Sequence, residues 1–302
     1  MSKYCVLYDP FPGGHSFRPE VAAWSTLQGE IVYQDITSVD CVTFIDTVNL
    51  AAEDKIIVCG DDGTLNRFVN EFYALVAKNN IYYYAVGSQT EFACDIGKQP
   101  GAEPTFLINR YLKELPSAAF GQFDRQFLTG IGFGLDSFVG EAARQRVKDG
   151  KTANYKSLVR RAVFQYKPGK VVVMVDGKLH VYEKAWLVAA MHGKSLWGGV
   201  PMAPNQDRMD KRKRLTVIVI HDVGKLKMLF ILQSLFKGKH VNRKSAVDVL
   251  NGHSINVTSE QPNLLCVDGT LYPGITTYQV KSSGFVADSR KKLNRNRQGG
   301  LI

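Results

Sequence analysis

Two adjacent aspartates between two glycines form the stretch best suited to chemistry on a phosphate, Gly60-Asp61-Asp62-Gly63-Thr64. Glycines at both ends would let backbone N–H groups approach a phosphate, and a carboxylate beside a phosphate can hold a divalent cation between them. A tight turn between a strand and a helix, capped by an aspartate, would account for the same residues without a ligand. On these residues alone both interpretations stay open.

The segments on either side predict how this turn is positioned. Residues 56–59 are an apolar run of strand length, and Leu65, Phe68, Val69 and Phe72 recur at helical spacing after the turn. A strand, a glycine-bearing turn and a helix therefore follow one another, and the amino end of the helix would favour a negatively charged ligand. The turn is not a P-loop, because the spacing G-x-x-x-x-G-K-S/T is missing.

The wider pattern predicts two domains. Up to residue 118, strands alternate with helices, which predicts an α/β domain with a parallel, Rossmann-like sheet and ligands at the carboxyl ends of its strands. The strands are expected at residues 4–8, 30–35, 56–59 and 81–86, and the helices include residues 16–27, 39–52 and 104–115. Residues 119–280 read mainly as short strands with a hairpin signal at Asp176-Gly177, which predicts an antiparallel β-sandwich. Residues 281–302 are expected to return to the first domain or to be disordered.

Several stretches resemble the diacylglycerol kinase catalytic domain family, which includes bacterial lipid kinases and sphingosine kinases. The first turn and the residues after it, Asn66 and Val69-Asn70-Glu71, resemble the family motif GDGTxNxxVN. Residues 87–93 (GSQTEFA) resemble its second glycine turn, and Ala203-Pro204-Asn205 and Asp268-Gly269 match motifs of its second domain. The resemblance spans nearly the whole chain in the same order, as in a divergent member. NAD kinases share the first turn but not the later motifs.

The resemblance implies ATP and Mg²⁺ as cofactors and assigns residues to them. ATP would be held by Asp9, Thr37, Gly60, Asp61, Asp62, Gly63, Thr64, Asn66, Gly87 and Ser88. Magnesium would be bound by Asp62, Asp136 or Asp210. The catalytic acids would be Asp268, Asp62 and Asp136, with Asp268 as the proton acceptor.

The sequence departs from the family at positions that matter for catalysis. Asp61 and Gln89 replace glycines, Thr90 replaces an asparagine, and Thr270 replaces the glutamate that follows Asp268-Gly269. A threonine cannot act as a general base near neutral pH. Four cations follow Asp210 directly, which disfavours a divalent ion there.

The charge of the chain predicts its partners. The 302 residues carry a net charge of +10, with basic clusters at residues 208–214, 225–244 and 290–297. No nucleic-acid-binding motif accompanies them, so an anionic membrane surface is the expected partner, and a merely solvated basic surface is the alternative. No apolar run is long enough to span a bilayer and the amino terminus lacks a signal peptide, so we expect a cytoplasmic protein that binds membranes peripherally.

Three functions follow from these observations. The first is an ATP-dependent lipid kinase that phosphorylates a hydroxyl group, most simply that of diacylglycerol to give phosphatidate, with the acceptor entering a cleft between the domains. The second is a degenerate protein that binds nucleotide or lipid without turnover. The third is a soluble-substrate kinase of the NAD kinase type. Whether the chain forms a homodimer stays open.

Overall fold

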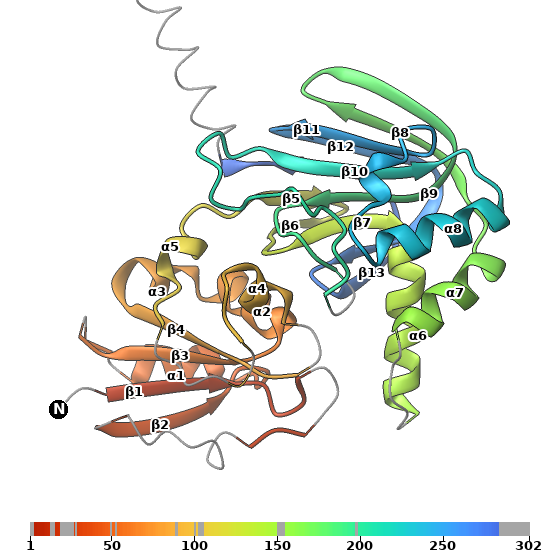
Figure 1. The fold of residues 1–302 in the computed structure, drawn as a ribbon. Helices are drawn as coiled ribbons and strands as arrows, with labels where there is room; N and C mark the ends of the chain where they lie inside the picture. The colour runs from red at the N-terminus through yellow and green to blue at the C-terminus, as the bar shows by residue number, and fades with distance from the viewer. Residues whose placement is uncertain are drawn as a thin grey trace, which may run out of the picture. The chain divides into compact units, whose positions relative to one another are not determined.

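The computed structural model of the chain describes residues 3–12, 16–18, 27, 29–48, 50–51, 53–87, 90–99, 101, 106–149, 155–196 and 199–283 (Figure 1). It divides the chain into two compact units, residues 1–114 and 115–302. The predicted boundary at residue 118 falls inside a strand of the second unit, Ser117–Phe120. The predicted carboxyl-terminal segment lies outside the described residues from position 284 onward.

The first unit contains a parallel four-stranded sheet in the order β2-β1-β3-β4. Its strands are β1 (Lys3–Tyr8), β2 (Glu30–Asp35), β3 (Lys55–Gly60) and β4 (Asn80–Ala85). The apolar run 56–59 is fully buried in β3, a central strand, because side chains on both faces of a parallel sheet are covered. The predicted parallel α/β domain is therefore confirmed.

Short helices lie between these strands, α1 (Cys41–Thr47), α2 (Asp62–Glu71) and α3 (Tyr73–Lys78), and two more follow β4, α4 (Glu91–Asp95) and α5 (Asn109–Leu112). The helix predicted at residues 104–115 is wrong in extent. Leu107 forms an antiparallel bridge with Tyr82 of β4, so the chain is still extended there and the helix has room for one turn only. Most of the helix predicted at residues 16–27 lies outside the described residues.

The second unit is built on one nine-stranded sheet in the order β11-β10-β9-β7-β12-β13-β5-β6, with β8 paired to both β9 and β12. The short strands are β5 (Ser117–Phe120), β6 (Phe123–Gln126), β7 (Gly130–Gly134), β8 (Gly169–Val175), β10 (Leu215–His221) and β11 (Val247–Gly252). The long strands are β9 (Lys178–Met191), β12 (Ser254–Val267) and β13 (Thr270–Lys281). All of the pairings are antiparallel, which confirms the predicted antiparallel β-rich domain.

Two long strands join the layers of this sheet. The first half of β9 pairs with β8 and its second half with β7, and β12 divides its pairing between the same two strands. The sequence pattern predicted short strands at residues 179–182 and 185–192 in place of β9, and at 255–258 and 264–267 in place of β12, which is wrong. In β12 the register shifts between Thr258 and Asn263, so the strand bends there without ending.

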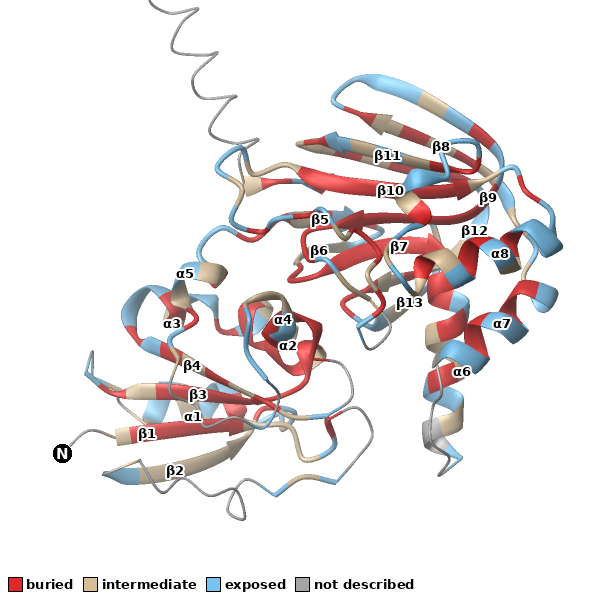
Figure 2. Ribbon diagram, in the orientation of Figure 1, coloured by how far each residue is buried: buried red, intermediate tan, exposed pale blue. Residues whose placement is uncertain are grey.

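Two apolar cores lie on opposite faces of the sheet (Figure 2). One lies between the strand layers and includes Phe133, Val173, Val217 and Tyr278. The other lies under the helices α6 (Leu135–Lys148), α7 (Tyr155–Gln165) and α8 (Lys225–Leu235). A 3₁₀ turn, His240–Asn242, follows α8. None of the described helices is both long and apolar enough to cross a membrane.

Candidate functional site

The turn after β3 is shaped by its first aspartate. Asp61 is the N-cap of α2, and its Oδ1 accepts hydrogen bonds from the Thr64 N–H (3.0 Å) and hydroxyl (3.1 Å). This is the capping interaction that a strand-to-helix turn requires. A Cβ on Gly60 would lie 2.3 Å from Thr64 Oγ1, so the packing of Thr64 requires a glycine there.

The second aspartate points into the unit. Asp62 is buried, and its Oδ2 accepts a hydrogen bond from the N–H of Phe92 in α4 at 2.9 Å. The hydroxyl of Tyr83 lies 3.5 Å from Asp62 Oδ1 and donates to the carbonyl of Gly60 at 3.0 Å. Burial and the nearby Asp62 raise the pKa of Tyr83 well above its ordinary value. Asp62 thus joins the first glycine turn to the start of α4.

Gly63 leaves the amino end of α2 open. Its N–H has no hydrogen-bond partner within the part of the chain that the structure describes. A Cβ at this position would approach only Asp61 Oδ1, at 3.3 Å, and the φ angle is ordinary, so internal packing does not demand a glycine. A helix amino terminus with an open N–H and no side chain in front of it suits a phosphate oxygen.

Two other loops meet this turn at the carboxyl ends of the strands. Asp9 follows β1, and its Oδ2 lies 3.2 Å from the Thr64 hydroxyl, whose single proton it shares with Asp61 Oδ1. Gly87 follows β4 with a φ of +104°, and a Cβ there would lie 3.1 Å from the carbonyl oxygen of Pro12. The structure therefore brings together the loops after β1, β3 and β4, as expected for a ligand site in a parallel sheet.

The remaining predicted nucleotide residues are less closely associated with the turn. Thr37 is exposed after β2, and its N–H and hydroxyl both donate to Asp35 Oδ1. Asn66 lies on α2, where its Oδ1 accepts a hydrogen bond from the Asn70 side chain at 3.2 Å. Ser88 and Gln89 lie outside the described residues.

In the second unit, Asp268 holds the backbone of a neighbouring strand. Its Oδ1 accepts hydrogen bonds from the N–H groups of Thr129 (2.8 Å) and Gly130 (3.0 Å), and its Oδ2 from that of Leu128 (2.6 Å). Asp268 and Gly269 both have positive φ angles and connect β12 to β13, which is the two-residue hairpin of the type I′ class. Asp268-Gly269 therefore forms a hairpin turn. Thr270 is exposed at the start of β13.

Asp136 is the other buried acid of this unit. It lies in the first turn of α6 and has a fractional exposure of 2%. Burial raises its pKa to about 7, although hydrogen bonds from its own N–H and from Ser137 oppose this effect. Asp136 in turn contributes to the raised pKa values of Tyr166 and Tyr278, which are due mainly to burial. Burial thus favours the protonated form of the Asp136 carboxyl.

The basic segment 208–214 is partly internal. Arg208 is buried, and its Nη1 donates to the carbonyl of Leu128 at 3.0 Å. Asp210 Oδ2 lies 3.8 Å from Arg214 Nε, and its Oδ1 accepts a hydrogen bond from the N–H of Arg212. Asp210 therefore stabilises a basic turn. Within the described residues, no three His, Cys, Asp or Glu side chains gather in a way that could hold a metal ion.

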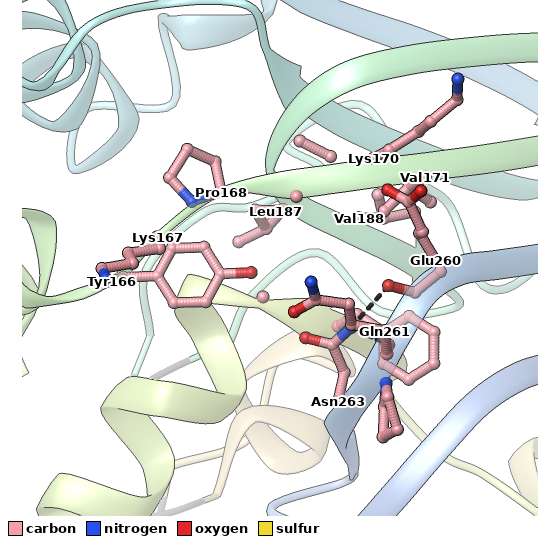
Figure 3. Close-up of a pocket in the computed structure, with 16 residues that line it drawn as sticks. Tyr166, Lys167, Pro168, Lys170, Val171, Leu187, Val188, Glu260, Gln261 and Asn263 are labelled. Carbon is pink, nitrogen blue, oxygen red and sulfur yellow. Dashed lines mark hydrogen bonds between the residues drawn. The ribbon is translucent and has the colours of Figure 1, made fainter.

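Two adjoining cavities lie next to Tyr166, which the sequence analysis did not single out. They measure about 240 Å³ and about 440 Å³, and both are lined by Gly134, Tyr166, Pro262 and Asn263. The smaller one has both polar and apolar residues in its wall, and Figure 3 shows the Tyr166 hydroxyl pointing toward the side chains of Gln261 and Asn263. The larger one is mostly apolar, with Phe138, Ala142 and Leu264 in its wall. No motif marks this site, because its lining comes from α6, the end of α7 and β12.

The comparisons with known proteins agree with this architecture. Residues 129–280 match the family model described as the YegS C-terminal NAD kinase beta sandwich-like domain. A solved structure named "a putative diacylglycerol kinase" from Bacillus anthracis str. Sterne is similar over 94% of both chains, with 21% identity and a TM-score of 0.64. A second one from the same strain, named a diacylglycerol kinase, is similar over 94% of this chain and 95% of its own, with 19% identity and a TM-score of 0.58. No curated protein sequence gives a significant match.

Proposed function

The chain belongs to the family of the YegS C-terminal NAD kinase beta sandwich-like domain, which confirms the resemblance to diacylglycerol kinases, and from this premise we propose that it is an ATP- and Mg²⁺-dependent lipid kinase. The acceptor would be the hydroxyl of a membrane lipid, most simply diacylglycerol. The observation that carries the proposal is the open amino end of α2 at Gly63, where the loops after three parallel strands meet.

The nucleotide would bind through the backbone of this turn. The N–H of Gly63 would donate to a phosphate oxygen, and Asp61 and Thr64 would hold the turn in shape through the capping bonds. Asp62 would hold Mg²⁺, since its carboxylate lies in the first turn of α2 next to Gly63, and carboxylate oxygens are preferred Mg²⁺ ligands. The metal, when bound, supplies charge neutralisation on the transferred phosphate. Because the described residues contain no acidic cluster, phosphate oxygens would provide other metal ligands.

The acceptor would place its hydrocarbon in the apolar cavity beside α6. At about 440 Å³ this cavity falls in the range of small-molecule sites, and Phe138, Ala142 and Leu264 would contact the chain. The adjoining smaller cavity, with the Tyr166 hydroxyl and the Asn263 amide, would take the polar end of the lipid. This pocket belongs to the second unit alone.

For the proton acceptor we favour Asp136 over Asp268. The carboxylate of Asp268 already accepts three backbone hydrogen bonds from residues 128–130 and would lose them if it turned toward a substrate. Asp136 lies two residues after Gly134, which lines both cavities, and burial raises its pKa to about 7, the range in which a general base is efficient. The rate should then rise with pH through about 7 and lose this dependence in Asp136→Asn.

The test is phosphoryl transfer. Purified protein would be incubated with ATP radiolabelled in its γ-phosphate, Mg²⁺ and vesicles that contain diacylglycerol, a sphingoid base or a prenol. We expect labelled phosphatidate. The absence of labelled lipid with every acceptor would overturn the proposal, and labelling of NAD added as a soluble acceptor would point to an NAD-kinase-type activity.

A binding protein without turnover is the second candidate, and a specific observation favours it. Asp61, Asp62 and Asp268 all use their carboxylates to hold neighbouring backbone, and Thr270 cannot serve as a base. Calorimetry separates the two candidates: ATP binding without any phosphoryl transfer would select the binding protein.

A further inference from the structure

Two neighbouring helices of the second unit expose large apolar side chains next to cations. On α7, Phe164 is 56% exposed and shares the outer face with Arg160 and Arg161, which lie four and three residues before it. On α8, Leu226 is 73% exposed and Phe230 62% exposed, one turn apart. The opposite faces of both helices are packed into the core beneath them, so they cannot turn to bury these side chains (Figure 2).

The two helices form one surface. The Nζ of Lys225, the first residue of α8, donates a hydrogen bond to the carbonyl of Phe164 at 2.8 Å. The next residue is Leu226. The α7–α8 face is defined here by the exposed side chains of Arg160, Arg161, Phe164, Leu226, Lys227 and Phe230.

This face has only positive charge. Neither α7 nor α8 contains an aspartate or glutamate, and none occurs in residues 223–247. Within the described residues, no salt bridge involves Arg160, Arg161 or Lys227. In the segment 208–214, Arg208 is buried, Arg214 lies beside Asp210, and a single large apolar side chain, Met209, is exposed, against three on the α7–α8 face. The unpaired cations and the exposed apolar side chains therefore coincide at α7–α8.

The chemistry of this face matches an anionic bilayer. Aromatic and aliphatic side chains partition into the headgroup boundary, while neighbouring Lys and Arg contact anionic lipid. Nucleic acid would use the cations but gain little from three apolar side chains. The face also adjoins the apolar cavity: Gln165 and Tyr166 follow Phe164 directly and line that cavity together with Phe138. A lipid could thus pass from the bilayer to the cavity over a short distance.

We propose that the α7–α8 face docks on anionic membranes by inserting Phe164, Leu226 and Phe230 into the interface, with Arg160, Arg161 and Lys227 contacting headgroups. Delivery of the acceptor lipid to the cavity beside Tyr166 rests on the proposed kinase function. The docking itself does not depend on the kinase function. At low salt each cation should contribute about fivefold to the partition coefficient.

Vesicle sedimentation tests the docking without ATP or turnover. The wild type should bind phosphatidylglycerol vesicles and not phosphatidylcholine vesicles, and salt should release it. The double variant Leu226→Ser/Phe230→Ser should bind at least tenfold more weakly. The matched control, Leu179→Ser/Val181→Ser, removes two exposed apolar side chains of the β8–β9 hairpin (61% and 50% exposed) and should bind like the wild type.

A second pair of variants tests the charges. Arg160→Gln/Arg161→Gln should weaken binding more than Lys211→Gln/Arg212→Gln, which removes two exposed cations from the other basic segment. Phe230→Trp should show a blue shift of tryptophan fluorescence on phosphatidylglycerol vesicles, and Leu179→Trp should show none. This readout remains valid if a serine variant folds poorly.

Two results would overturn the docking surface: vesicle binding by the α7–α8 variants that equals that of the wild type, or control variants that lose as much binding as the α7–α8 variants. A protein partner would then be the alternative for this face. Vesicle binding with the expected pattern but without labelled lipid in the transfer assay would keep the docking surface and remove the kinase function. The two failures are therefore distinguishable.

Discussion

The dipeptide Asp-Gly occurs in both candidate regions, and its two settings differ. Asp62-Gly63 begins a helix at the end of a parallel strand, with Asp62 turned inward and Gly63 left open. Asp268-Gly269 is the turn of an antiparallel hairpin, and both residues have positive φ angles. The Asp268 carboxylate accepts hydrogen bonds from three N–H groups of residues 128–130. The first turn keeps a backbone donor for a ligand, whereas the second uses its acidic group internally.

The difference between the two turns comes from the segments that flank each Asp-Gly dipeptide and not from the dipeptide itself. Asp62-Gly63 precedes a segment with helical periodicity, and Asp268-Gly269 lies between two strands whose residues pair directly across the turn. The catalytic potential of an aspartate in such a motif therefore depends on which backbone groups its carboxylate already binds.

The largest expected effect is on stability, at Asp268. In Asp268→Asn an amide NH₂ would face backbone N–H groups, so at least one buried donor loses its acceptor. Unsatisfied buried groups cost about 1–3 kcal/mol each, and we expect the free energy of unfolding to fall by roughly 3 kcal/mol or more in urea titrations. The matched control is Asp176→Asn: Asp176 also starts an Asp-Gly hairpin and accepts N–H bonds from His253 and Ser254, but it is exposed. A similar loss in both variants would show that burial of Asp268 does not matter.

The second effect separates Asp136 from Asp268 as buried acids. The pKa of Asp136 is about 7 in the folded protein against an ordinary value of 3.8, so the folded state keeps a proton that the unfolded state loses. This stabilisation is fully present below pH 4 and is lost as the pH rises to about 7. The free energy of unfolding of the wild type should therefore drop, by at most about 4 kcal/mol, over this range relative to Asp136→Asn. Parallel pH curves for the two proteins would remove Asp136 as a group that titrates near neutral pH.

The third effect concerns the first glycine. A Cβ in Gly60→Ala would lie within 2.6 Å of three side-chain atoms of Thr64, which is fixed by hydrogen bonds to Asp61 and Asp9. Overpacking of this kind costs about 1–3 kcal/mol, and thermal unfolding would measure it. An unchanged melting temperature would mean that the turn is looser than its contacts indicate.

The sequence was sufficient for the parallel sheet and for the first turn, because their signals are local, but it divided the long strands β9 and β12 of the second sheet. The buried run 56–59, the helical spacing after it and the glycines at 60 and 63 all lie within one short segment. The role of Asp268 was not predictable in this way, since its three partners lie about 140 residues away in the sequence. The burial of Arg208 has the same cause: its partner, the Leu128 carbonyl, is 80 residues distant, so its surroundings cannot be read from the basic segment. The cavity at Tyr166 likewise depends on which distant segments pack together.

The smallest expected effect on stability is at Gly63, and it carries the central claim. The added Cβ of Gly63→Ala meets only Asp61 Oδ1 at 3.3 Å, so the free energy of unfolding should change by less than about 1 kcal/mol. The same methyl group would stand in front of the open N–H that we assign to the phosphate.

Calorimetric titration of ATP with Mg²⁺ into the wild type and into Gly63→Ala tests this assignment most directly. We expect the wild type to bind ATP and the folded variant to bind it at least tenfold more weakly. Equal ATP affinity in the two proteins, or no ATP binding by the wild type, would contradict the assignment of the turn after β3 as a nucleotide site.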